Sequence, residues 1–391
     1  MATDPGLYVE RVTTFDEFCA LEEHWNQLAT YSVTTIFLTF TWLVEWWKVF
    51  GEDYKLWILV ACRDSDILGI LPLMIQVRSG IFRHLLFMGE DDTTPNHLDV
   101  IARPEDQQAV LAAFARHITL ASAEWDVLDL NKFPGDGSSA AELQTFLQSM
   151  NLSSSLEIYT TCPYVVLPDS FDLYLGSRSK STRRDFRRDK RILKRDFPDS
   201  RFGTVQDPED LDRVLDAMIG FHQARWTGRG YTGTFSSPRL IRFFKDVARH
   251  TMQAGMLRLY YLQVGDEIVA VKYDFRLAES MQSYLGGFDP RWSKYGPGNL
   301  TLGFAIEQAI VEHAQIYDFL EGNEPHKRRW MTDTRDNVRL RAFAPRFRGV
   351  LARTKSGVQE AIVAFAICCV PVRIRRPIYQ AWRRWKQRSI S

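Results

Sequence analysis

The sequence of 391 residues has few cysteines and no cysteine cluster. No CxxC and no Cys/His group occurs among Cys19, Cys62, Cys162, Cys368 and Cys369. An odd number of cysteines in so long a chain argues against a disulfide framework or a zinc site and indicates a reducing cytoplasm. We therefore expect a cytoplasmic protein without a metal.

Long apolar runs and an excess of one charge are also missing. The N-terminus, MATDPGLYVERVTTFDEF, lacks the basic and apolar segments of a secretory signal. No run of 18 apolar residues occurs, which excludes a clear membrane-spanning helix. The net charge is +1, so charge gives no indication of nucleic-acid binding, and we expect no DNA partner. The length suits two globular domains.

The sequence does contain an internal repeat of its predicted elements. The order helix, helix, strand, strand, strand, helix, strand occurs twice. Its first copy comprises residues 15–28, 41–50, 56–62, 67–77, 82–88, 105–122 and 125–130. Its second copy comprises residues 207–226, 237–254, 257–264, 268–277, 281–287, 299–314 and 316–320. This order predicts two α/β modules, each with helices packed over a mixed sheet.

We divide the chain accordingly into residues 1–165, 166–346 and a tail, 347–391. The modules differ at the end of the third strand. The first module has an acidic loop there, with Glu90, Asp91 and Asp92, which is unsuited to phosphate. We therefore expect the first module to be degenerate for cofactor binding.

The second module has a glycine-rich loop at the same place. Residues 281–310 read MQSYLGGFDPRWSKYGPGNLTLGFAIEQAI and predict a strand, a loop and a helix. Unpaired N–H groups at a helix N-terminus suit a pyrophosphate, although an ordinary strand-to-helix turn is also rich in Gly and Pro. The candidate cofactor-binding residues are Gly286, Gly287, Lys294, Tyr295, Gly296, Gly298 and Asn299.

Two runs in this module, SYLGGFDPRWSKYGPGNL and YDFLEGNEPHKRRW, resemble the CelD-like acetyltransferases. This branch of the GNAT family is linked to bacterial cellulose and exopolysaccharide loci. Shorter runs such as LGILPLM, NHLDVI and FHQARW extend the resemblance over residues 35–335. It implies tandem GNAT-like modules and a donor that is acetyl-CoA or another acyl-CoA. The usual Q/R-x-x-G-x-G/A loop is replaced here by SKYGPG, which leaves the pyrophosphate contacts open.

In GNAT folds the acyl group enters between two splayed strands, so residues after 316–320 border the reaction centre. Glu324 is our candidate general base, with pairing to Lys327 or Arg328 as the alternative. Lys327 is a candidate for stabilising the oxyanion or binding an anionic acceptor, or it is a surface lysine. Asp318 is either catalytic or the anchor of a buried basic residue, and we favour the anchor.

A basic connector, residues 178–195, joins the modules. Its arginines recur at helical spacing and suit phosphate or carboxylate recognition, although such charge runs are often solvated faces. His222 and Trp226 lie four residues apart on one helix face, where Trp226 either stacks on a sugar or adenine ring or packs in the core. The candidate substrate-binding residues are Arg184, Arg187, Arg188, His222, Trp226 and Arg329.

The tail contains an apolar run, AIVAFAICCVPV, followed by RIRRPIYQAWRRWKQR. Trp382 and Trp385 with flanking cations are typical of an interfacial helix on an anionic membrane, and a helix packed on the second module is the alternative. We expect peripheral contact with the inner face of the membrane.

The sequence thus favours an acyl-CoA-dependent N- or O-acyltransferase, transferring acetyl to an envelope polysaccharide, a nucleotide-sugar or a lipid-linked precursor. One alternative is a transferase like the Fem proteins, distant relatives of this branch, which would use aminoacyl-tRNA and a peptidoglycan precursor. Another is a non-catalytic binding subunit of a polysaccharide synthase.

Overall fold

The computed structural model describes residues 6–78, 81–91, 93–227, 233–322 and 324–355. The helices of the first half are α1 (Phe15–Ala20), α2 (Glu22–Ser32), α3 (Phe40–Phe50), α4 (Gln107–Leu120) and α5 (Ser139–Ser149), with the 3-10 helices η1 (Ile36–Leu38) and η2 (Gly51–Asp53). Its strands are β1 (Leu7–Val12), β2 (Lys55–Leu56), β3 (Ile58–Arg63), β4 (Asp66–Leu71), β5 (Leu73–Arg78), β6 (Phe82–Phe87), β7 (Ile101–Ala102), β8 (Val127–Pro134) and β9 (Ser154–Val166).

The second half repeats this plan. Its helices are α6 (Phe171–Ser177), α7 (Lys180–Asp196), α8 (Pro208–Thr227), α9 (Pro238–Gln253), α10 (Pro297–Val311) and α11 (Pro325–Trp330), with η3 (Thr234–Ser236) and η4 (Pro290–Tyr295). Its strands are β10 (Arg201–Thr204), β11 (Leu257–Val264), β12 (Glu267–Leu277), β13 (Ser280–Phe288), β14 (Ile316–Asp318) and β15 (Asp333–Phe343). The predicted mixed α/β architecture is confirmed.

The strands form two sheets. One has the order β1-β3-β4-β7, and the other has the order β10-β11-β12-β13-β14-β9-β15-β8-β6-β5-β2. Pairing is antiparallel except between β6 and β8 and between β13 and β14. Each module therefore contributes one parallel pair to the larger sheet.

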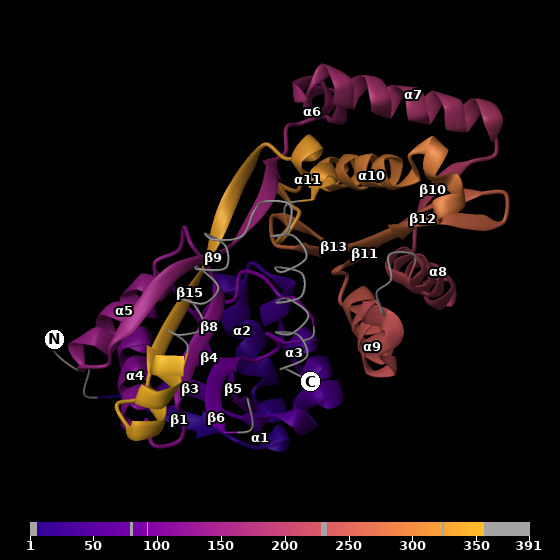
Figure 1. Cartoon of the computed structure of the whole chain (residues 1–391). Helices are drawn as coiled ribbons and strands as arrows, with labels where there is room; N and C mark the ends of the chain where they lie inside the picture. Colours follow the sequence, from indigo (N-terminus) through magenta and orange to yellow (C-terminus); the bar gives the residue numbers. More distant parts are fainter. Residues whose placement is uncertain (1–5, 79–80, 92, 228–232, 323, 356–391) are drawn as a thin grey trace.

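Two long strands join the modules. β9 and β15 pair from Asp333 opposite Tyr164 to Ala342 opposite Ser154, and Figure 1 shows them as a ribbon between the two lobes. β15 also pairs with β8 of the first half, while the end of β9 pairs with β14 of the second half. Because β9 contacts both modules, the division at residues 165 and 166 stays a prediction.

Helices cover both faces of the second module's sheet. α8 and α9 lie on one face, where Val271, Tyr273 and Phe275 of β12 join their core. α10 lies on the other face with Ala270 and Tyr260, as the two-residue period of strands requires. α7 packs on the outside of α10 through Phe186 and Leu193, and it forms the upper edge of the molecule (Figure 1).

Two predicted elements are divided in the structure. The single strand expected over residues 67–77 breaks at Pro72, which lacks the N–H donor that a central strand uses. Its halves enter different sheets, β4 beside β3 and β7, and β5 beside β2 and β6. The helix expected over residues 15–28 is α1 and α2, which meet at Leu21.

The predicted membrane-contacting tail lies mostly outside the described residues. Residues 347–355 are helical, and Trp382 and Trp385 belong to the part that the structure does not describe. None of the helices within the described ranges has the length and apolar character needed to cross a membrane.

Candidate active site

The parallel strands β13 and β14 separate at their ends. β14 pairs with β13 only from Ser280 to Gln282, whereas β13 continues to Phe288 against β12. Across from β12, Asp274 faces Ser283 and Tyr273 faces Leu285, so Tyr284 is an extra, bulged residue. Bulges redirect side chains and backbone groups and recur beside active sites. The site therefore begins where β13 leaves β14.

A buried polar cluster lies beneath this bulge. The Lys272 ammonium donates to the Leu285 carbonyl at 3.2 Å and lies 3.2 Å from a carboxylate oxygen of Asp274. The other Asp274 oxygen accepts from the Tyr317 hydroxyl at 2.6 Å. Burial lowers the pKa of Lys272, although Asp274 opposes this effect, and burial raises the pKa of Asp274. The prediction from sequence missed this cluster because Lys272 lies within an apolar strand without a motif.

Glu324 and Lys327 meet in the turn after β14. The Lys327 ammonium donates to the Glu321 carbonyl at 2.6 Å and lies 3.3 Å from a Glu324 oxygen. Gly322 has a φ of 130°. A Cβ there would approach a Glu324 oxygen to 2.4 Å and the Lys327 nitrogen to 2.8 Å. Only glycine therefore allows this turn to bring the two charged groups together.

These two side chains differ in their exposure. The Lys327 side chain is 14% exposed, whereas the Glu324 side chain is 46% exposed. Glu324 thus reaches solvent. It forms the ion pair with Lys327 that the sequence suggested as an alternative to its role as general base. The arrangement still leaves a carboxylate beside a largely buried ammonium at the end of β14.

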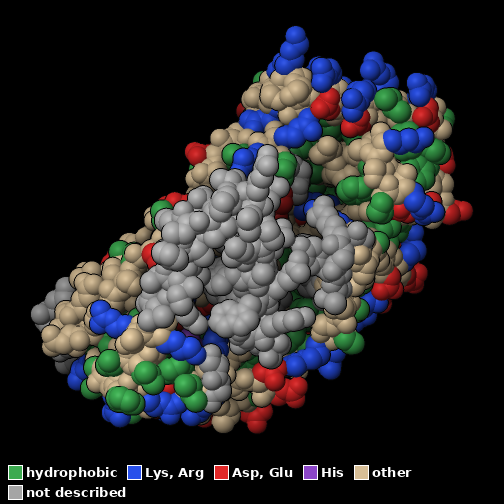
Figure 2. Space-filling model, in the orientation of Figure 1, with side chains coloured by type: hydrophobic (Ala, Val, Ile, Leu, Met, Phe, Trp, Pro, Cys, Tyr) green, Lys and Arg blue, Asp and Glu red, His purple; other side chains and the backbone are tan. Residues whose placement is uncertain are grey.

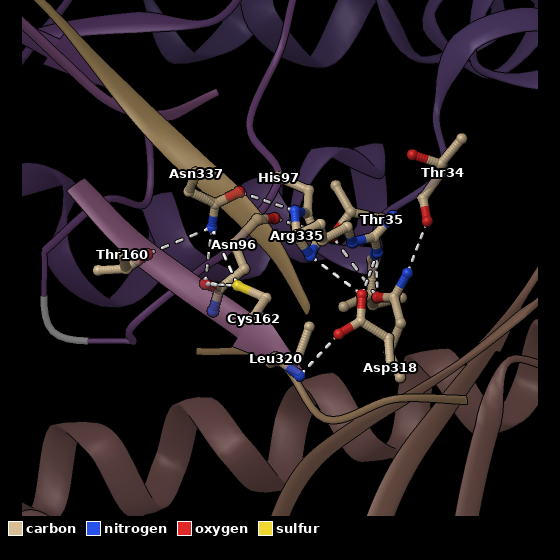
Figure 3. Close-up of polar contacts among 12 residues, drawn as sticks. Thr34, Thr35, Asn96, His97, Thr160, Cys162, Asp318, Leu320, Arg335 and Asn337 are labelled. Atoms are coloured by element: carbon tan, nitrogen blue, oxygen red, sulfur yellow. Dashed lines mark hydrogen bonds and ion pairs between the residues drawn. The ribbon is translucent and has the colours of Figure 1, made fainter. Parts of the chain in front are cut away.

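Asp318 lies behind this turn and is fully buried. Its carboxylate accepts from the Leu320 N–H at 2.7 Å, lies 3.0 Å from His97 Nε2 and contacts the Arg335 guanidinium (Figure 3). Burial would raise the pKa of Asp318, but His97, Arg335 and the Leu320 N–H outweigh it and hold that pKa well below its usual range. This geometry favours the anchoring role among the two that the sequence left open.

The residues around Asp318 come from both modules. His97 Nδ1 lies 2.8 Å from Asn337 Oδ1, and the Asn337 amide donates to Asn96 Oδ1 at 3.1 Å and to Cys162 Sγ at 3.3 Å. Figure 3 shows that these side chains converge from the 96–97 loop, β9, β14 and β15. His97 belongs to the NHLDVI run, but nothing in its spacing indicated a partner in the other module.

A second contact between the modules involves β13. The Gln282 amide donates to the Thr34 carbonyl at 2.6 Å and accepts from the Ile36 N–H at 3.0 Å. The Tyr284 hydroxyl donates to the Thr93 carbonyl. The first module therefore contacts the second at the bulge, beside the candidate site.

The predicted cofactor loop is packed against protein atoms. A Cβ at Gly287 would lie 3.0 Å from Phe221, and one at Gly298 would lie 3.0 Å from Phe288. Gly286 faces Lys272 on β12. Gly296 is left-handed, with a φ of 63°, and its Cβ would lie 2.4 Å from an Asp189 oxygen.

The other loop residues flank the start of α10. Tyr295 is buried, whereas Lys294 is exposed with its ammonium 4.6 Å from the centre of the Tyr295 ring. Asn299 is half-buried in the first turn of α10. A phosphate role for this loop stays a prediction.

The predicted substrate residues are divided between two surfaces. Arg184, Arg187 and Arg188 are exposed on α7, and Arg329 reaches it from α11 by a 2.6 Å ion pair with Asp185.

His222 lies on the opposite side of the sheet, in α8, with its ring 5.0 Å from that of Phe235. Burial lowers the pKa of His222 to about 4. A Cβ at Gly287 would lie 3.4 Å from the backbone nitrogen of His222, so the predicted residues Gly287 and His222 are neighbours. The side chain of Trp226 lies outside the described part of the structure.

Residues 180–328 match the acetyltransferase (GNAT) domain family. Among solved structures, FemX has a TM-score of 0.59 at 11% identity, covering 84% of this chain and 96% of FemX. L-PGS from Bacillus licheniformis has a TM-score of 0.52 at 11% identity, covering 81% of this chain and 90% of that one. A conserved protein of unknown function from Bacteroides thetaiotaomicron VPI-5482 has a TM-score of 0.54 at 11% identity, covering 86% and 99%. No curated protein sequence matches the chain.

The domain match covers residues 180–328, which is less than half of the chain. It supports a GNAT-type acyltransferase activity, and a GNAT domain implies an acyl-CoA donor. The solved structures share the fold over most of both chains, and at these identities they carry no information on the substrate.

Proposed function

We propose that the protein transfers an acyl group, acetyl in the simplest case, from acyl-CoA to an amine or hydroxyl at the splayed ends of β13 and β14. The observation that carries this proposal is the pair Glu324 and Lys327, which the turn at Gly322 brings together between β14 and α11. The bulge at Tyr284 supports it, because the separated strand edge offers backbone groups to a bound thioester.

The reaction divides between these two side chains. The acceptor nitrogen or oxygen attacks the thioester carbonyl carbon, and its proton passes to the Glu324 carboxylate. The oxyanion that forms is stabilised by the Lys327 ammonium. When the carbon–sulfur bond breaks, the sulfur leaves with the electron pair of that bond and takes the proton from Glu324. The products are the acylated acceptor and the free thiol of CoA.

The other candidate residues hold this site in position. Asp318, with His97 and Arg335, fixes the end of β14 from behind. The first module borders the site at Thr34, whose carbonyl accepts a hydrogen bond from the Gln282 amide. We infer that the acceptor binds between the two modules and that the first module, degenerate for cofactor, shapes that side.

The resemblance to CelD-like acetyltransferases supports a choice of acceptor. We propose an envelope polysaccharide, a nucleotide-sugar or a lipid-linked precursor, modified at the cytoplasmic face of the membrane. The acceptor amine or hydroxyl is then carried on a sugar.

The first test is titration calorimetry with acetyl-CoA, followed by thiol release in the presence of amino sugars, nucleotide-sugars and extracted lipid-linked precursors. Wild type should bind acetyl-CoA and release thiol with at least one acceptor. Lys327→Met should bind acetyl-CoA but release thiol about 100- to 1000-fold more slowly, whereas Lys55→Met, at an exposed lysine on β2, should behave as wild type. An acidic substitution at Gly296 is a poor probe, because its side chain would collide with Asp189.

A second candidate is a transferase that uses aminoacyl-tRNA and a peptidoglycan precursor. One observation favours it, since the Asp189 carboxylate lies against the loop where CoA phosphates would bind. Absence of binding to acetyl-CoA and to longer acyl-CoA would contradict the main proposal. Binding of aminoacyl-tRNA that weakens steeply with salt would then support the second candidate.

A further inference from the structure

A carboxylate lies beside the N-terminus of α10, where GNAT phosphates are expected. Asp189 of α7 is 5% exposed, and one of its oxygens lies 2.4 Å from where a Gly296 Cβ would be. Gly296 is the N-cap residue of α10, so this carboxylate interacts with the positive end of the helix dipole. A phosphate bound at this end of α10 would lie close to this carboxylate, which also forms a 2.8 Å ion pair with Arg188.

The outer face of α7, by contrast, is an exposed array of cations. Arg187, Lys190, Arg191, Lys194 and Arg195 line a shallow depression of about 550 Å³. Figure 2 shows the basic side chains along this edge of the molecule. The apolar face of the same helix is turned inward onto α10.

Several of these cations lack a carboxylate partner. Arg195 pairs with Asp196 at 2.7 Å, and Lys194 donates to the Ser200 carbonyl at 3.3 Å. Arg187, Lys190 and Arg191 form no ion pair with any of the described residues. Like charges on adjacent turns repel one another, and a bound phosphate would remove that repulsion.

This array borders the predicted cofactor loop. The end of α7 contacts η4, where the Phe197 ring lies 4.8 Å from that of Trp292 and 5.4 Å from that of Tyr295. The exposed Lys294 stands on the same side, and its pKa is raised chiefly by Tyr295 and to a smaller extent by Asp196. The α7 cations therefore lie next to the loop in which the sequence predicts the cofactor phosphates.

We propose that the α7 face formed by Arg187, Lys190, Arg191, Lys194 and Arg195 binds phosphate groups, rather than the α10 N-terminus, beside which the Asp189 carboxylate lies. The inference rests on the proposed function, since the expected source is the phosphates of the acyl-CoA donor. A phospholipid headgroup carries the same chemistry and is the other source. Arginine suits either, because its guanidinium binds phosphate oxygens in pairs.

The test is titration calorimetry of the full-length protein with CoA and with dephospho-CoA, which lacks the 3′-phosphate. The variant is Arg187→Gln, Lys190→Gln and Arg191→Gln combined. Its control, Lys55→Gln, Arg116→Gln and Arg353→Gln, removes the same charge from exposed cations on other elements. We expect the triple variant to bind CoA at least tenfold more weakly and the control to stay within twofold of wild type.

Asp189→Asn distinguishes the two phosphate positions, because it keeps the shape of the side chain and removes its charge. If phosphate binds the α7 face, this change should alter CoA affinity by less than threefold. If phosphate must displace Asp189 from α10, Asp189→Asn should tighten binding at least tenfold while the triple variant changes little. That result would overturn the inference and leave the proposed function intact.

Vesicles separate the two sources of phosphate. The same proteins are mixed with phosphatidylcholine vesicles that contain or lack an anionic phospholipid. Loss of anionic-vesicle binding in the triple variant, with unchanged CoA affinity, would assign the face to lipid headgroups. If wild type binds no acyl-CoA, the proposed function fails and the vesicles alone decide the inference. Equal binding of wild type and triple variant to both ligands would overturn it.

Discussion

The two parallel strand pairs of the molecule have the same geometry and opposite chemistry. β8 pairs with β6 from Val127, and β14 pairs with β13 from Ile316. Two residues later each strand carries a buried aspartate, Asp129 in the first module and Asp318 in the second. Both aspartates bind an arginine of the shared strand β15, Arg339 and Arg335 respectively. The repeat is therefore visible in the ion pairs as well as in the element order.

The two strand ends differ in the charged side chains that surround them. At the first strand end Asp91 forms a 2.7 Å ion pair with Arg78, and Glu90 contacts Asn131. Acidic side chains thus lie at the strand end of the first module, whereas the corresponding strand end of the second module has Lys272 and Lys327. The fold therefore supplies two equivalent strand ends, and a few side chains near each end give the two modules opposite charge there.

The largest expected effect is on stability, at the aspartate of the second strand end. Asp318→Asn leaves the Arg335 guanidinium without its counter-charge, and breaking a buried pair in this way costs about 3–5 kcal/mol. Denaturant unfolding should show this loss. Asp185→Asn, which breaks a surface pair with Arg329, should destabilise the protein far less.

The pH dependence of the same variant sharpens the test. The pKa of Asp318 is lowered in the folded protein, so its contribution is present above the ordinary carboxyl pKa and is lost as the pH falls below it. Wild type should therefore lose stability more steeply than Asp318→Asn below about pH 4. Equal slopes for the two proteins would show that Asp318 does not carry this interaction.

The next effect is on activity and separates the two strand ends directly. Lys327→Met removes the ammonium that we assign to the oxyanion, and a loss of about 100- to 1000-fold in kcat is expected for one such donor. Glu90→Gln, at the other strand end, should leave kcat within twofold. A comparable loss in both variants would show that the first module takes part in the chemistry.

Much of the fold was predictable because its signals are local. β11 spans the predicted residues 257–264, and α10 begins two residues before the predicted 299–314. Apolar periodicity and a glycine turn suffice for such elements. β9 and β15 were missed because their sequences, SSLEIYTTCPYVV and DTRDNVRLRAF, are largely polar and alternate only over the short runs LEI and VRLRA. These two segments are strands because they pair with each other, although they lie far apart in the sequence.

The candidate site likewise contains one pair that is close in sequence and others that only the fold brings together. Glu324 and Lys327 are three residues apart, so the chain itself brings them together. His97 and Asn337 are 240 residues apart, and only the module interface places them 2.8 Å from one another. Asp189 is the clearest case, since no spacing in the basic connector indicates that one of its few carboxylates faces Gly296.

The smallest expected effect concerns the acidic strand end of the first module. Burial, with Asp129 and Asp91 nearby, raises the pKa of Glu90 to about 8. The folded protein then keeps a proton that the unfolded chain has already lost, so stability falls as the pH rises from the ordinary carboxyl pKa toward 8. Glu90→Gln cannot ionise and should escape this loss, becoming more stable than wild type by about 2 kcal/mol between pH 6 and pH 8. Denaturant unfolding at a series of pH values measures it, with exposed Glu23→Gln as the matched control. A variant that follows the wild-type curve would mean that Glu90 is ionised in the folded protein. The difference between the acidic strand end of the first module and the cationic strand end of the second would then depend on Arg78, which would compensate both Glu90 and Asp91.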